Sequence, residues 1–141
     1  MDDAPQPRTD DGEQLTAAQL DLLASVFDLV REGETAAVVG LLDRRLPVNL
    51  TNSKGDTLLI LAAYHKHAEL VRALLERGAD TARVNDRGQT ALAAAVFRSS
   101  AEIVRDLLDA GGDPQLGDPD AVAVATFFEL PEMATLLGAP R

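Results

Sequence analysis

The feature that most constrains this fold is an internal repeat with a period of 33 residues. Segment 55–80 matches segment 88–113 without a gap, and twelve positions are identical. The identical pairs are Gly55 and Gly88, Thr57 and Thr90, Leu59 and Leu92, Ala62 and Ala95, Ala68 and Ala101, Glu69 and Glu102, Val71 and Val104, Arg72 and Arg105, Leu74 and Leu107, Leu75 and Leu108, Gly78 and Gly111, and Asp80 and Asp113. Such a period indicates stacked units that bury their apolar faces against their neighbours.

Each unit is predicted to contain two short helices. Apolar runs at 58–64 and 91–97 predict the first helices, and Thr57 and Thr90 stand where a side chain caps a helix start. Segment 68–77 predicts a second helix with one apolar stripe.

Four glycines frame these helices. Gly55 and Gly88 precede the caps, in turns where glycine takes a positive φ at low cost, and Gly78 and Gly111 stand where a glycine ends a helix.

This pattern resembles the ankyrin repeat, a turn followed by two antiparallel helices and a loop. Segment 55–63 (GDTLLILAA) is similar to the opening motif of that family, and segment 77–80 (RGAD) to its closing motif. Departures occur where the family usually has Pro, His and Gly: Leu58 and Ala91 replace Pro, Ile60 and Ala93 replace His, and Lys66 and Ser99 replace the inter-helix Gly.

The resemblance weakens toward both ends of the chain. We expect a degenerate first repeat at about 19–51, two regular repeats at 52–84 and 85–117, and a truncated last repeat at 118–139. Residues 1–14 are polar and acidic, and a disordered tail is expected there, ahead of a repeat domain at 15–141. The predicted fold is an all-α ankyrin-type solenoid of about four helix-turn-helix repeats with degenerate end caps.

Composition excludes several function classes. The net charge of −10 argues against nucleic-acid and anionic-membrane partners. The chain has no cysteine, which excludes disulfides and thiolate metal sites but does not fix the compartment. It has no secretory signal and no apolar run of membrane-spanning length, so a cytoplasmic location is expected. We also expect a monomer. The charge is uneven, because segment 53–118 carries ten acidic and eight basic residues and is nearly balanced.

The sequence contains few residues that could form a catalytic or metal-binding site. The only histidines are His65 and His67. The pair is either a metal site or two ordinary turn residues, and we favour the second interpretation. Aspartates 113, 118 and 120 lack calcium-loop spacing and predict a solvated loop. We therefore expect no enzyme activity, no cofactor and no metal.

The resemblance implies that loop tips and first helices form a concave surface that binds another protein. The candidate residues are Lys54, Asp56, Arg87 and Gln89 at the loop tips, and Arg31, Tyr64, His65, Phe97 and Arg98 at the ends of the first helices. Aromatic and Arg side chains are enriched in interface hot spots, so one hypothesis is that Tyr64, Phe97 and Arg98 anchor an acidic or amphipathic segment. The alternative is that both rings merely pack between repeats.

Arg72 and Arg105 also repeat. Each lies three residues after a glutamate, Glu69 or Glu102, and we interpret them as surface ion pairs along one helix.

The expected function is therefore a non-catalytic adaptor or scaffold for a partner protein. The alternative is a dedicated inhibitor, immunity or accessory subunit of one enzyme, such as a detoxifying catalase. The acidic tail at 1–14 either is inert or covers the basic column by mimicking an acidic ligand.

Overall fold

The computed structural model describes residues 16–138, which form eight helices and no strand. The predicted tail at 1–14 and the last three residues of the chain lie outside this range. The helices are α1 (Ala17–Glu32), α2 (Thr35–Asp43), α3 (Leu58–Tyr64), α4 (Ala68–Glu76), α5 (Ala91–Phe97), α6 (Ala101–Asp109), α7 (Ala121–Phe127) and α8 (Pro131–Gly138). The all-α prediction is confirmed.

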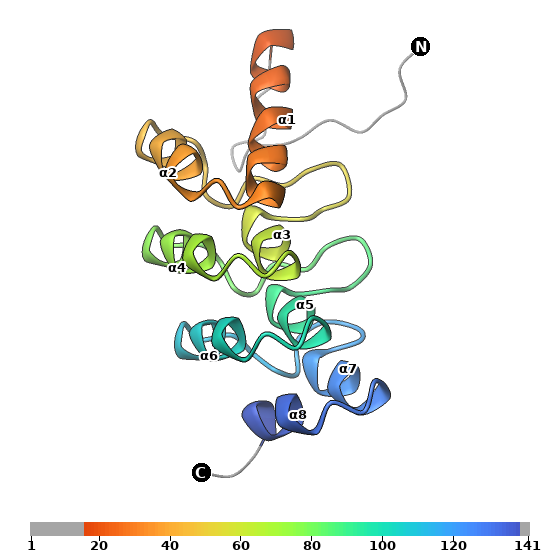
Figure 1. Cartoon of the computed structure of the whole chain (residues 1–141). Coiled ribbons are helices and arrows are strands. Elements are labelled where there is room, and N and C mark those ends of the chain that lie inside the picture. The colour runs from red at the N-terminus through yellow and green to blue at the C-terminus, as the bar shows by residue number, and fades with distance from the viewer. Residues whose placement is uncertain (1–15, 139–141) are drawn as a thin grey trace.

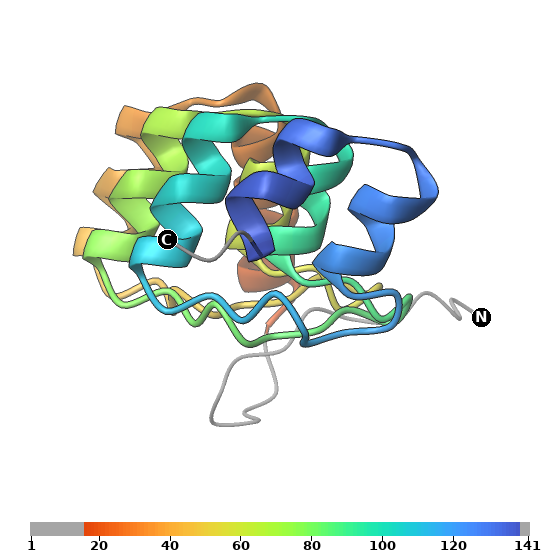
Figure 2. The same cartoon turned by 90° about the horizontal axis from the view of Figure 1, so that it is seen from below.

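The helices form two layers (Figure 1). Helices α1, α3, α5 and α7 stack in an inner layer, in which α3 contacts α1 and α5, and α5 contacts α7. Helices α2, α4, α6 and α8 stack beside them in an outer layer, each joined to its inner partner by a short turn. Figure 2 shows the long loops between successive pairs running along one side of both layers. The result is a solenoid of four helix pairs in the described range.

The inner helices begin at side-chain caps. The hydroxyl oxygens of Thr57 and Thr90 accept hydrogen bonds of 3.0 Å from the backbone N–H groups of Ile60 and Ala93, which confirms the predicted caps. Asp120 takes this role in the last repeat and accepts a 2.7 Å bond from Ala123. Each cap satisfies a backbone donor that a helix start leaves without a partner.

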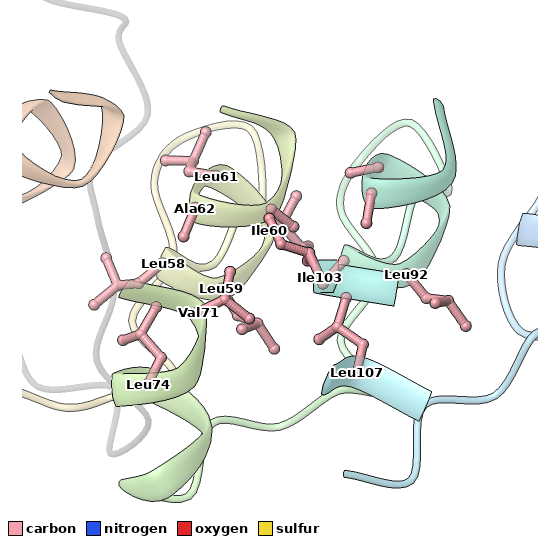
Figure 3. Packing of buried hydrophobic residues seen from close by; sticks show 14 of the residues in the cluster. Leu58, Leu59, Ile60, Leu61, Ala62, Val71, Leu74, Leu92, Ile103 and Leu107 are labelled. Carbon is pink, nitrogen blue, oxygen red and sulfur yellow. The ribbon is translucent and has the colours of Figure 1, made fainter. Parts of the chain in front are cut away.

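The core consists of aliphatic side chains and closely packed alanines. All of α3 except Tyr64 is buried, and so is all of α5 except Phe97. The stripe of α4, which includes Val71 and Leu74, closes over this inner layer together with Ile103 and Leu107 from α6 (Figure 3). Because each repeat buries its face on its neighbours, the inner helices are held rigidly side by side.

The turns between paired helices need a left-handed backbone. Gly33 has φ of +74°, and the corresponding residues of the next repeats, Lys66 and Ser99, have φ of +64° and +55°. Glu129 occupies the same position in the last repeat with φ of +54°. Non-glycine residues are uncommon in this region, so three of the four turns carry local strain. The predicted positive φ is confirmed at Gly55 and Gly88, with +78° and +79°.

Ion pairs on the outer layer join different repeats. The guanidinium of Arg72 contacts the carboxylates of Glu102 and Asp106 on α6, and Arg77 pairs with Asp43 on α2 at 3.2 Å. The prediction that Arg72 pairs along its own helix with Glu69 was therefore wrong. The repeat places α6 directly beside α4, and this neighbour is closer to the Arg72 side chain than the preceding turn of α4.

Candidate interaction surface

A groove of about 210 Å³ lies between the long loops and the inner helices of the first three repeats. We call it the inner groove. Its lining residues are Arg31, Asn52, Lys54, Asp56, Ile60, Leu61, Tyr64, His65, Arg87, Gln89 and Ala94. Seven of the nine predicted binding residues are in this lining, and Phe97 and Arg98 are not.

Phe97 and Arg98 adjoin the groove through Tyr64. The rings of Tyr64 and Phe97 are nearly parallel, with 6.3 Å between their centroids. The guanidinium carbon of Arg98 lies 5.2 Å from the centroid of the Tyr64 ring, which is a cation–π contact. The structure therefore brings all nine predicted residues into one continuous surface, although their role in binding stays a prediction.

Two asparagines shape the loops that carry the predicted tip residues. The side-chain oxygen of Asn52 accepts hydrogen bonds from the backbone N–H groups of Lys54 and Asp56, at 2.9 and 3.0 Å. Asn85 repeats this arrangement with Arg87 and Gln89, both at 2.9 Å. These turns fix the backbone at the tips, so Lys54 and Arg87 project from rigid positions.

Asp56 and Gln89 already have partners within the protein. The side-chain amide of Asn85 donates to the Asp56 carboxylate at 2.7 Å and to the Gln89 side-chain oxygen at 3.0 Å. A second bond of 3.4 Å joins Asn52 to Asp56. These contacts give Asp56 and Gln89 a role in bridging loops. Asn52 and Asn85 were not among the predicted residues, although they too are identical at the 33-residue spacing.

The groove is cationic in an acidic protein. Lys54, Arg87 and Arg98 form no ion pair with any side chain of the described residues, whereas Arg31 pairs with Asp28 at 3.0 Å. Asp56 keeps its negative charge, because its side-chain donors are neutral amides, but the lining also contains Arg31, Lys54 and Arg87 and so has a net positive charge. The surface is therefore suited to carboxylates.

The two histidines lie at the turn beside Arg31. Nε2 of His67 donates to the backbone carbonyl of Arg31 at 2.7 Å and so connects the first two repeats. Partial burial lowers the pKa of His65, and the positive charges of His67, Arg31 and Arg98 lower it further. Within the described range, no group of three His, Cys, Asp or Glu side chains is arranged to hold a metal ion.

Four aromatic rings form a continuous row on the surface. We call this row, which consists of Tyr64, Phe97, Phe128 and Phe127, the aromatic row. Phe97 and Phe128 meet edge to face with centroids 5.2 Å apart, and Phe128 and Phe127 with centroids 4.9 Å apart. Tyr64 is 38% exposed, Phe97 45%, Phe128 48% and Phe127 79%. The rings do pack between repeats, but they pack on one another and stay partly exposed to solvent.

The sequence prediction did not include Phe127 and Phe128 in the surface. The spacing from α5 to α7 is 30 residues, not 33, because the loop before α7 is shorter. Aligning Phe97 with Phe127 at this shorter spacing would have extended the aromatic column into the last repeat.

No helix in the described part of the chain is long and apolar enough to cross a membrane.

Comparison with known proteins agrees with this architecture. A family model described as ankyrin repeats (3 copies) matches residues 22–118, and it ends where the regular spacing ends. A Pseudomonas aeruginosa protein named "Putative ankyrin repeat protein PA3287" is 46% identical over 72 residues, which cover 51% of this chain and 39% of that protein. The chain thus spans less than half the length of this relative. On the family match, the repeat architecture and the residue pattern, the chain belongs to the ankyrin-repeat family.

Proposed function

We propose that this chain is a non-catalytic protein-interaction module that binds an acidic or amphipathic segment of a partner protein in the inner groove. Ankyrin repeats indicate protein–protein interaction as the general role. The observation that carries the finer proposal is a cationic groove beside exposed aromatic rings, on a chain with a net charge of −10.

Charge supports an acidic ligand. Lys54 and Arg87 line the groove from neighbouring loops, and Arg98 lies over the ring of Tyr64, which also lines the groove. A carboxylate that binds between them meets donors from two sides, and Arg presents planar donors that match a carboxylate. A polyanionic nucleic acid would face repulsion from the rest of the surface, because the chain as a whole is strongly acidic.

Rigidity supports binding by a preformed surface. The backbone of each loop tip is bonded to an asparagine, and the loops are bonded to each other through Lys54 O and the N–H of Asp86 at 3.0 Å. A partner therefore does not have to order these loops, and the entropic cost of binding is smaller. Exposed Tyr64 and Phe97 offer large apolar faces that also need no reorganisation.

The test is capture of partners from a lysate of the source organism by three forms of the protein. These are the wild type, the groove variant Tyr64→Ala/Phe97→Ala/Arg98→Glu, and the control Arg105→Glu, which makes the same charge change on the exposed face of α6. Circular dichroism first establishes that all three are folded.

A protein retained by the wild type and the control but lost from the groove variant would support the proposal. Retention of the same proteins by all three forms would contradict it. If the captured partner is an enzyme, its turnover with and without this chain distinguishes an inhibitor from a scaffold.

A further inference from the structure

At one repeated position of the surface, the side chain changes from cationic to aromatic between the third and the last repeat. The residues that follow α5 and α7 each contact the aromatic ring that ends the previous inner helix: Arg98 lies over Tyr64, and Phe128 lies against Phe97. The guanidinium carbon of Arg98 lies 5.2 Å from the centroid of the Tyr64 ring, and the centroids of the Phe128 and Phe97 rings are also 5.2 Å apart. The last repeat therefore places an aromatic ring where the third repeat places a cation.

The loops also lose their basic residues toward the last repeat. The loop before α7 has 11 residues, from 110 to 120, whereas the loop before α5 has 14, from 77 to 90. The shorter loop has no counterpart of Lys54 or Arg87. Asp118 and Glu129 are exposed at this end of the molecule, so the cationic part of the surface stops at the third repeat.

We infer that the groove selects a segment with two parts, a cluster of carboxylates over the first three repeats and adjoining bulky apolar side chains over Phe97, Phe128 and Phe127. This inference rests on the proposed function and adds the order of the two parts. The acidic part binds beside Lys54, Arg87 and Arg98. The apolar part covers the end of the aromatic row, where Phe127 is 79% exposed.

Both halves of the surface enforce this order. Binding in the opposite spatial order, with the acidic part over the last repeat, would place the carboxylates beside Asp118 and Glu129 and the apolar side chains among the unpaired cations, whichever way the peptide backbone runs. The first arrangement is repulsive, and the second removes water from charges without giving them a partner. Covering the exposed phenylalanines in the correct order removes a continuous apolar patch from water.

The occupant is a segment of a partner protein. Residues 1–14 of this chain supply carboxylates, but their sole bulky apolar side chain is Met1, so they match only the acidic part. A second copy of the chain has the same net charge of −10, and long-range repulsion opposes its approach. A two-part partner segment satisfies both halves of the surface at once.

Fluorescence anisotropy with labelled synthetic peptides tests the inference on the full chain. The two-part probe has four consecutive glutamates followed by alternating leucine and phenylalanine, and a second probe has the same residues in the opposite chain direction. The acid-only probe replaces every apolar residue by serine. The protein variants are Phe127→Ala, Lys54→Glu/Arg87→Glu, and the control Leu22→Ala, which truncates an exposed apolar side chain on α1.

Either two-part probe should bind about tenfold more tightly than the acid-only probe, since the phenylalanines gain contacts. Phe127→Ala should remove about fivefold or more of that advantage and leave the acid-only affinity unchanged, as a double-mutant cycle requires for a direct contact. Lys54→Glu/Arg87→Glu should weaken both probe types, and Leu22→Ala neither.

The outcomes distinguish failure of the two-part inference from failure of the proposed function. If Phe127→Ala changes the affinities of both probe types equally or of neither, the two-part order is wrong. In that case, a loss of probe affinity in Lys54→Glu/Arg87→Glu would still support the proposed binding of an acidic segment in the groove. If neither probe type binds the wild type at millimolar concentration, the proposed function is contradicted together with the inference.

Discussion

Asn85 donates a 2.7 Å hydrogen bond to the carboxylate of Asp56 in the preceding repeat. Its side chain is also bonded to Gln89 and to two backbone N–H groups of its own loop. One buried amide therefore shapes a loop and joins that loop to its neighbour, so the geometry of the candidate loop tips and the stability of the stack depend on the same residue.

Asn85→Ala should lower the free energy of unfolding by about 1–3 kcal/mol, because a buried hydrogen-bond hub is lost and its partners remain. Urea denaturation measures this loss. The matched control is Asn52→Ala, whose side chain is more exposed and whose amide bond to Asp56 is 3.4 Å. An equal loss in the two variants would contradict the linking role of Asn85.

The positive φ at Gly33 predicts a sharp difference between two glycines. A Cβ at Gly33 would lie 2.6 Å from Nδ1 of His67, the residue that binds the Arg31 carbonyl. Gly33→Ala should destabilise the protein by about 1–2 kcal/mol through backbone strain alone, and more if His67 is displaced.

Gly40→Ala is the control for this prediction. Gly40 lies within α2 and has nothing within 4 Å of its Cβ position, so alanine should stabilise the helix by about 0.5–1 kcal/mol. Thermal unfolding of both variants checks the signs, and destabilisation by both would refute this interpretation.

The strained turns at Lys66 and Ser99 predict stabilising substitutions. Both residues are exposed, and both have a positive φ. Glycine relieves about 1–2 kcal/mol of strain. It also increases the entropy of the unfolded chain, at a cost of about 0.4–1 kcal/mol. Lys66→Gly and Ser99→Gly should each stabilise the protein by up to about 1 kcal/mol in urea denaturation. Lys66→Ala keeps the strain, and an equal gain from that variant would exclude backbone strain as the cause.

The lowered pKa of His65 predicts a dependence on pH. The folded state favours neutral His65, because burial and nearby positive charges oppose protonation. The unfolded chain therefore binds more protons in acid, and this contribution to stability is lost as pH falls below about 6.5, the unperturbed value. NMR titration should place the pKa of His65 below that value, and His65→Gln should reduce the loss of stability on acidification. A value at or above 6.5 would refute this prediction.

The 33-residue period explains why much of this fold is predictable from sequence. Thr57 and Thr90 define the starts of α3 and α5, and the apolar runs that follow end at Tyr64 and Phe97, as predicted. Local capping and periodicity decide these boundaries, so little information from tertiary structure is needed.

Features that depend on contacts between repeats were less predictable. Spacing along one helix suggested Glu69 as the partner of Arg72, whereas stacking provides Glu102. The shorter last loop hid the alignment of Phe127 with Phe97. Seven of the nine candidate residues line one groove, and the other two adjoin it through Tyr64, while their role in binding stays a prediction.

Comparison of two single charge reversals tests the central claim most directly. Arg98→Glu changes the charge beside the groove, over the Tyr64 ring that lines it, and Arg105→Glu makes the same change on α6, which contributes no residue to the lining. The account predicts that Arg98→Glu weakens the captured partner's affinity at least about tenfold, the effect of losing a charged hot spot. It predicts no such loss for Arg105→Glu. Equal affinities of the two variants for the partner would contradict a binding site in the inner groove.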